Sequence, residues 1–205
     1  MMPTITRRIL AGTTLATLFV FVYWGWALST SLSKQNPEKF GELPSFNMTS
    51  AANQSLIRKE NLLGKVWIAG FIFTRCGGPC PIITLNMSRL QRELPGEVQL
   101  VSFTVDPDWD KPEILARYAR RINADLKRWF FLTGEKKELY NLLYEGFKLP
   151  ILENPNSPAG FRVTHSTKLA LVDKKGFVRG YYDGTDDSAM KILKRDVLKL
   201  LEDKL

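Results

Sequence analysis

The 205-residue chain contains two cysteines and a single histidine, and these are the side chains best suited to chemistry. Cys76 and Cys80 lie close together, separated by two glycines and a proline, whereas His165 lies far along the chain. A close pair of thiols can form and exchange a disulfide, or supply two soft ligands to a metal ion. The glycines allow the intervening loop to adopt either arrangement. The spacing therefore predicts metal binding or thiol–disulfide exchange.

The flanking sequence predicts how the cysteines are positioned. Residues 66–73 are apolar and rich in β-branched and aromatic types, which indicates a buried strand, and Pro81 suits the first turn of a helix. Cys76 and Cys80 would thus lie between a strand end and a helix start, where the helix dipole favours thiolates, so we expect both sulfurs to be reactive. A purely structural disulfide is the alternative, but closing so short a loop stabilises little.

Three stretches, taken in order, resemble the SCO/SenC family. Residues 73–81 contain the Cys-x-x-x-Cys-Pro pattern of that family's copper-site motif, and residues 102–112 and 163–173 match two later segments. Members of this family are membrane-anchored copper chaperones with a thioredoxin-like fold that help to assemble the dinuclear copper centre of cytochrome c oxidase. One departure is Thr164, which stands where many members carry an acidic residue.

The resemblance implies an α/β, thioredoxin-like fold, in which a central mixed sheet is flanked by helices, and a copper site formed by Cys76, Cys80 and His165. In that fold His165 would face the cysteine loop from the position where thioredoxins carry a cis-proline. Two thiolates and an imidazole suit Cu(I), with Cu(II) as the alternative, whereas calcium, magnesium and manganese prefer oxygen ligands. Zinc is the main competitor, but a structural zinc site normally has four protein ligands, and no further cysteine or histidine exists.

The implied function is that of a copper chaperone, not an enzyme, which takes copper from a donor protein and delivers it to the copper-bearing subunit of cytochrome c oxidase. The alternative is a thiol–disulfide reductase that keeps the oxidase copper-site cysteines reduced, with Cys76 attacking and Cys80 resolving the mixed disulfide. His165 separates these hypotheses, because metal binding needs an imidazole and thiol exchange does not. A peroxidase would leave the second cysteine and the histidine unexplained, and a structural interaction module is the fourth hypothesis.

The N-terminal region predicts a membrane anchor. Residues 9–28 are uncharged and predominantly apolar, a run long enough to cross about 30 Å of hydrocarbon as a helix. Arg7 and Arg8 precede it, which places residues 1–8 in the cytoplasm or matrix and the rest in the periplasm, another extracytoplasmic space or the mitochondrial intermembrane space. A cleaved signal peptide is the alternative, although its apolar core is normally shorter. Polar residues 29–45 predict a tether, and residues 46–205 the thioredoxin-like copper-binding domain.

The net charge of +8 raises the question of a nucleic-acid partner. The basic residues are spread along the chain and interleaved with acidic ones, without a basic stripe or a known binding motif. We therefore expect no nucleic-acid binding. An anionic membrane surface or an acidic patch on a protein partner explains the positive net charge better than a nucleic-acid partner does.

Hydrophobic periodicity predicts the remaining elements. After the cysteines, apolar residues recur at helical spacing up to Pro95, which makes Met87 a core residue and not a copper ligand. Strands are predicted at 98–105 and 129–132, a hairpin at 46–63, and helices at 110–123, 135–144 and 187–201. Asp110 and Glu113 have the spacing of a capping box. We therefore expect Asp106 and Asp110 to be structural.

Residues 167–173 and 177–182 predict a hairpin in which Gly176 supplies a left-handed turn residue. Residues 146–162 contain several prolines and asparagines and show no periodicity, which predicts a long irregular loop. Because this loop ends three residues before His165, we expect it to cover or frame the site.

Overall fold

The computed structural model describes residues 20–24, 37–154, 156–157 and 163–203, without the side chains of Thr164 and His165. The chain divides into two units, residues 1–36 and 37–205. In the first unit residues 20–24 are helical, and the rest of the predicted anchor at 9–28 lies outside the described residues. Within the described parts of the chain, no helix combines the length and the apolar character needed to cross a membrane.

The second unit is built on an eight-stranded mixed sheet. Across the sheet the strands are β1 (Gly41–Glu42), β10 (Phe177–Asp183), β9 (Lys168–Val172), β4 (Trp67–Ile72), β5 (Gln99–Thr104), β6 (Trp129–Thr133), β2 (Asn47–Ser50) and β3 (Leu56–Arg58). The central strands β4, β5 and β6 are parallel, and the other pairings are antiparallel. Every residue of β4 and β5 is buried, as expected for parallel strands covered on both faces.

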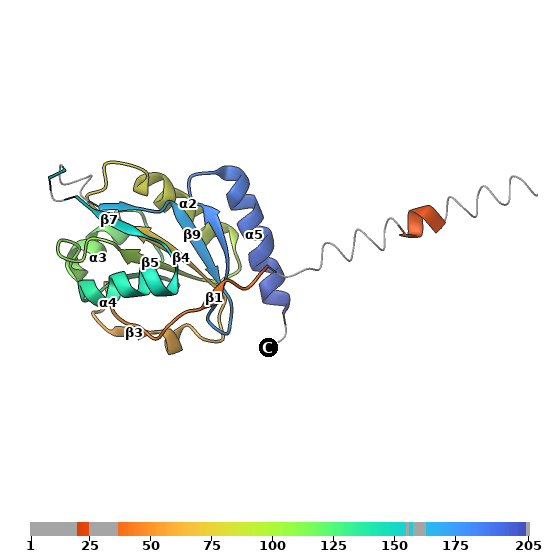
Figure 1. Cartoon of the computed structure of the whole chain (residues 1–205), viewed down its shortest axis with the longest axis horizontal. Coiled ribbons are helices and arrows are strands. Elements are labelled where there is room, and N and C mark those ends of the chain that lie inside the picture. The colour runs from red at the N-terminus through yellow and green to blue at the C-terminus, as the bar shows by residue number, and fades with distance from the viewer. Residues whose placement is uncertain (1–19, 25–36, 155, 158–162, 204–205) are drawn as a thin grey trace, which may run out of the picture. The chain divides into compact units, whose positions relative to one another are not determined.

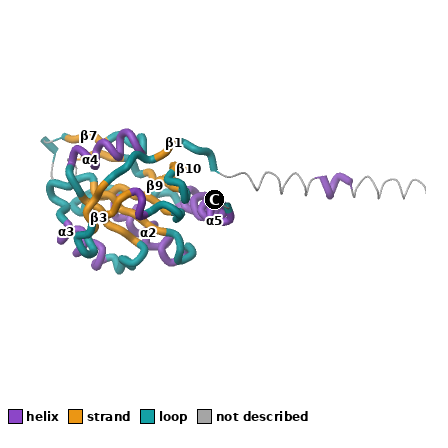
Figure 2. Tube along the Cα trace, turned by 90° about the horizontal axis from the view of Figure 1, so that it is seen from below, coloured by secondary structure: helices purple, strands orange, loops and turns teal. Residues whose placement is uncertain are grey.

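Helices cover both faces of this sheet. The first hydrophobic cluster joins one face of the strands to α2 (Cys80–Glu93), α3 (Pro112–Arg121) and α5 (Asp187–Glu202). The second joins the opposite face to α4 (Lys136–Asn141) and the π-helical turn Leu142–Gly146 that follows it. Figure 2 shows α4 on one side of the strands and α2, α3 and α5 on the other. The predicted α/β architecture, a mixed sheet flanked by helices, is confirmed.

The periodicity arguments are confirmed residue by residue in α2 and α5. Ile83, Met87 and Leu90 of α2 are buried in the first cluster, so Met87 is a core residue. The predicted apolar face of α5 lies in the same cluster: Met190, Leu193, Val197 and Leu200. The β9–β10 hairpin is also confirmed, and Gly176 has a φ angle of 84° in its turn.

The compact unit begins at Pro37, earlier than the predicted domain boundary at residue 46. β1 pairs with β10, and Leu43 is 1% exposed. The buried Arg179 holds this segment, because its guanidinium contacts Asp173 at 2.8 Å and its Nε donates to the Pro37 carbonyl at 3.0 Å. The final part of the predicted tether is therefore packed on the domain.

Two local predictions are wrong. α3 begins at Pro112 with Lys111 as its N-cap and no side-chain cap, so the capping box does not form. The 146–162 region is not a continuous irregular loop, because it contains β7 (Ile151–Glu153). β7 pairs with β8 (Val163–His165) in a separate two-stranded antiparallel sheet, shown beside the main sheet in Figure 1. Residues 155 and 158–162 lie outside the described residues.

Candidate metal and thiol site

The cysteine loop, residues 73–80, connects β4 to α2 as predicted. The N–H of Cys76 donates to the Phe73 carbonyl at 3.2 Å, and the Cys76 sulfur accepts a 3.4 Å hydrogen bond from the N–H of Gly78. Cys80 is the first residue of α2. Cys76 is half-buried, whereas Cys80 is 1% exposed. Of the two cysteines, Cys76 is therefore the more accessible to solvent.

The two thiols are hydrogen-bonded to each other, and this contact dominates the electrostatics of Cys80. The hydrogen bond with Cys76, followed by burial, raises the pKa of the Cys80 thiol well above its usual range. The sequence predicts that the helix start favours the thiolates of both cysteines, whereas the hydrogen bond with Cys76, followed by burial, favours the protonated form of Cys80.

Asp110 holds the first part of the cysteine loop. Its carboxylate is 0% exposed and accepts hydrogen bonds from the Thr74 N–H at 3.0 Å, the Thr74 hydroxyl at 2.5 Å and the Thr104 hydroxyl at 2.7 Å. Burial raises the pKa of Asp110 despite these contacts. The expected structural role of Asp110 is thus confirmed, although its carboxylate binds the cysteine loop and not the start of α3.

Arg75, the residue before Cys76, is held by the same segment after β5 that contains Asp110. Its guanidinium forms a 2.7 Å ion pair with Asp106 and lies 4.2 Å from the centre of the Trp109 ring. Trp109 is 45% exposed, so this pair forms part of the surface beside Cys76. Neither Arg75 nor Trp109 stands out by residue type alone. Both stand inside the motif stretches, and their position there is the signal that could have identified them.

The backbone of His165 comes to the same edge of the sheet as the cysteine loop. β9 runs antiparallel to β4 with Ala170 opposite Ala69, so the segment before β9 lies at the carboxyl end of β4. The Gly184 N–H donates to the Thr167 carbonyl at 2.9 Å, and Asn86 of α2 donates to the Gly184 carbonyl at 2.8 Å. These contacts bind the segment after His165 to the helix that begins with Cys80.

The side chain of His165 lies outside the described part of the structure. Among the residues whose side chains are described, no three histidine, cysteine or acidic residues form a metal-binding group. The predicted ligands are therefore brought to one edge by topology, with two thiols in contact and the backbone of the third residue nearby.

Comparison with known proteins decides the family. The sequence model of the SCO1/SenC family matches residues 34–201. The chain belongs to this family. It is 35% identical over 142 residues to the SCO1 protein homolog of Bacillus subtilis, covering 67% of this chain and 72% of that protein. It is 34% identical over 133 residues to a Stutzerimonas stutzeri protein named for copper binding, covering 63% of each.

A solved structure supports the same fold for this SCO1/SenC protein. BsSco is described as a member of the Sco family of cytochrome c oxidase assembly proteins in which a disulfide switch was identified. It superposes with a TM-score of 0.70 at 30% identity, covering 83% of this chain and 98% of that one. The thioredoxin-like fold of the SCO1/SenC family is therefore shown.

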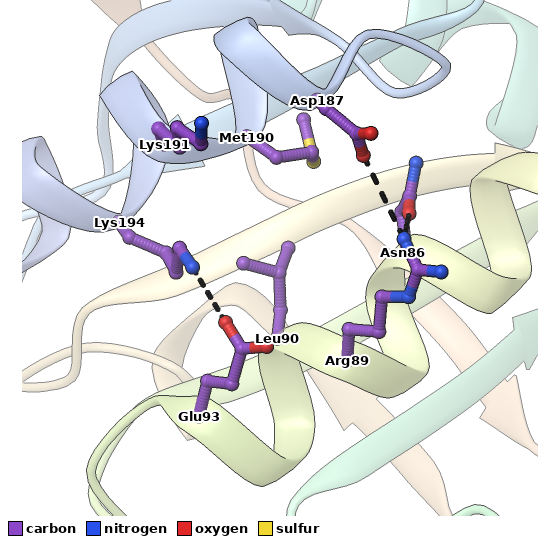
Figure 3. A pocket seen from close by; sticks show the side chains of 8 residues that line it. All are labelled: Asn86, Arg89, Leu90, Glu93, Asp187, Met190, Lys191 and Lys194. Atoms are coloured by element: carbon purple, nitrogen blue, oxygen red, sulfur yellow. Dashed lines mark hydrogen bonds and ion pairs between the residues drawn. The ribbon is translucent and has the colours of Figure 1, made fainter.

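A pocket of the SCO1/SenC domain lies between α2 and α5, away from the cysteine loop (Figure 3). Its volume is about 180 Å³. Its charges pair across the two helices, because Lys194 contacts Glu93 at 2.6 Å and Arg89 contacts Asp187 at 3.6 Å. The pocket thus lies at an interface between two helices where four of the five charged lining side chains are paired.

Proposed function

We propose that this chain is a membrane-anchored copper chaperone that binds one copper ion through Cys76, Cys80 and His165 and delivers it to the copper centre of cytochrome c oxidase. One observation carries the proposal: two thiols in mutual contact lie at the sheet edge that also receives the backbone of the chain's single histidine. Soft sulfur ligands favour Cu(I), and Cu(II) is the alternative state. A bound cation also stabilises the thiolate form of Cys80 that burial disfavours.

The relatives support copper as cargo and the oxidase as its destination. The Stutzerimonas stutzeri relative is named for copper binding, and BsSco is described as belonging to a family of cytochrome c oxidase assembly proteins. A shell of three protein ligands suits a carrier, because ligands of an acceptor can enter while the carrier's own ligands leave. The partners of this cycle are a copper donor protein and the copper-bearing subunit of the oxidase.

The anchor and the location belong to the same proposal. The uncharged apolar run at 9–28, preceded by Arg7 and Arg8, supports a single-pass topology with the copper domain in the periplasm, another extracytoplasmic space or the intermembrane space. Labelling of the cysteines by a membrane-impermeant thiol reagent in intact cells or organelles, after mild reduction, is the expected result. Recovery of the native chain in the soluble cytosolic fraction would remove this part of the proposal.

The second candidate is a thiol–disulfide reductase acting on the oxidase copper-site cysteines. The different exposure of the two cysteines favours the reductase, because the more accessible Cys76 can attack a partner disulfide. The buried Cys80 would then resolve the mixed disulfide. The Cys76 thiolate would attack a partner disulfide and release one partner thiolate. Cys80 would then displace the second partner sulfur, which leaves a Cys76–Cys80 disulfide and a reduced partner dithiol after proton uptake. Two electrons pass from this chain to the partner.

Metal analysis of the reduced chain tests the leading proposal. We expect the purified full chain, exposed to Cu(I) and Zn(II) together, to retain one copper and little zinc. Cys76→Ser or Cys80→Ser should abolish tight retention, because one sulfur and one imidazole leave the ion under-coordinated. His165→Ala should weaken retention while the Cys76–Cys80 disulfide still forms and exchanges. Unchanged copper retention in His165→Ala would refute the three-ligand site, and normal oxidase assembly with that variant would favour the reductase.

A further inference from the structure

Three side chains outside the cysteine loop join α4 to β7, and we call them the α4–β7 clamp: Lys136, Tyr140 and Glu153. The ammonium group of Lys136 contacts the Glu153 carboxylate at 2.6 Å, and the Tyr140 hydroxyl donates to the same carboxylate. α4 and β7 lie side by side in Figure 2. Glu153 therefore receives both a cation and a hydroxyl from one face of α4.

The clamp also reaches the loop that follows β5. The Tyr140 hydroxyl also lies within hydrogen-bond distance of the Val105 carbonyl, 3.1 Å away, which is a second acceptor besides Glu153. Lys136 contacts the Asp108 carboxylate at 3.2 Å. This loop is the one that supplies Asp106 to Arg75 and Asp110 to Thr74. One short segment is thus bound to the cysteine loop on one side and to the clamp on the other.

The clamp is connected to His165 through the pairing of β7 with β8. In the two-stranded sheet Glu153 stands opposite Val163, and Ile151 stands opposite His165. Val163 is buried in the second hydrophobic cluster, which Ile151 also contacts. A clamp on Glu153 therefore restrains β7, the pairing partner of the strand that carries His165.

The charges within the clamp support a lasting contact. Lys136 and then Tyr140 lower the pKa of Glu153, so its carboxylate stays ionised near neutral pH. Burial, followed by the contact with Glu153, raises the pKa of Tyr140, so its hydroxyl remains a donor. Each member thus keeps the protonation state in which it binds the others.

We propose that the α4–β7 clamp is a positioning device for His165, which fixes the distance between the histidine strand and the cysteine loop and so sets how strongly the imidazole contributes to copper retention. This inference rests on the proposed function, because it takes His165 as a copper ligand. Lys136, Tyr140 and Glu153 are positioning residues that act through the strand and do not touch the metal.

The test compares clamp variants with matched controls in the purified full chain. Tyr140→Phe and Glu153→Gln are paired with Tyr144→Phe and Glu145→Gln, which alter an exposed tyrosine and an exposed glutamate near α4. Retention is measured by competition between the protein and a colorimetric Cu(I) chelator, and the nitrogen coupling of bound Cu(II) by electron paramagnetic resonance. Each clamp variant is also prepared in the His165→Ala background.

We expect each clamp variant to weaken copper retention about tenfold, which corresponds to about 1.4 kcal/mol. The nitrogen coupling should change as well, whereas both controls should match the parent. In the His165→Ala background the same clamp substitutions should change retention less than about twofold, because coupled residues lose their effect when the partner is removed.

Two patterns would overturn the clamp. Parent-like retention and nitrogen coupling in Tyr140→Phe and Glu153→Gln would show that the clamp does not position His165. Equal losses with and without the imidazole would assign the clamp to general stability. Failure of the proposed function would look different: the parent would retain no copper, or His165→Ala would retain copper as tightly as the parent. Either result would also refute the clamp proposal, because that proposal takes His165 as a copper ligand.

Discussion

Replacing Asp110 tests whether a buried carboxylate holds the cysteine loop in place. Asp110→Ala leaves the Thr74 N–H and two hydroxyls without their acceptor. Each buried donor without a partner costs about 1–3 kcal/mol, but the hydroxyls can turn and the buried charge disappears, so we expect a net loss of roughly 2–4 kcal/mol in the free energy of unfolding. Copper retention should fall as well, because Thr74 is two residues before Cys76.

Asp110→Asn is the matched control. Its carbonyl can accept from the Thr74 N–H and the Thr104 hydroxyl, while its amide donates to the Thr74 hydroxyl oxygen, so the loss should stay near about 1 kcal/mol. Urea denaturation with an unchanged slope measures both values. Equal stability of the Ala and Asn variants would contradict a role for Asp110 in holding the loop. So would an Ala variant that loses stability but retains copper as tightly as the parent.

The pH dependence of the Asp110 variants has a defined sign. Burial raises the folded-state pKa of Asp110 above its usual value of 3.8, so the folded state holds this proton more tightly than the unfolded state. Its contribution to stability is therefore greatest below the unfolded pKa and is lost as pH rises through the folded pKa. The stability of the parent relative to Asp110→Asn should fall as pH rises above about 4. If the stability of the parent relative to Asp110→Asn instead rises with pH, the folded-state pKa of Asp110 is not raised.

Three further predictions concern the supports around the site. In Gly184→Ala the new Cβ would lie 2.9 Å from the Thr167 carbonyl oxygen, so we expect a stability loss of about 1–3 kcal/mol and weaker copper retention, with Gly96→Ala as a tolerant control. Hydrogen bonds from Thr185 lower the pKa of Asp183 to about 2, so the stability that Asp183→Asn removes should be present above about pH 4 and vanish in acid titration toward pH 2. Arg179→Met should lower the free energy of unfolding by about 3–5 kcal/mol and expose residues 37–45 to protease, because the buried Asp173 and the Pro37 carbonyl lose their partner. Unchanged proteolysis would show that Arg179 does not hold residues 37–45 on the domain.

Local pattern predicted the elements that carry the cysteines. The apolar run before Cys76 and the helical spacing after Cys80 each reflect burial against the same sheet, so β4 and α2 could be read from short windows. The structural role of Asp110 was also predictable, but its partner was not. A capping box is a local hydrogen-bond pattern, whereas the contact of Asp110 with Thr74 joins residues 36 positions apart.

Long-range pairing explains the other differences. Residues 37–45 have no periodicity, and their packing depends on the distant Arg179. β7 is too short to give an alternating signal and forms only because it pairs with β8 across the 154–162 region. The burial of Cys80 is likewise a tertiary property, since a helix start in a sequence indicates the dipole and not the side chains packed over it.

Sheet topology accounts for the three separated stretches of the family resemblance. β4 and β5 are parallel with Ile72 opposite Thr104, so the loops that follow them leave from one edge. β9 is antiparallel to β4, so the segment that precedes it arrives at the same edge. The carboxyl end of parallel strands is where loops from different parts of a chain can converge on a ligand. The proposed copper site needs a cysteine loop, a support for that loop and an opposing ligand, and the topology allows each to come from a different strand at this edge. The order of the motifs along the chain therefore follows from the order in which the strands reach that edge.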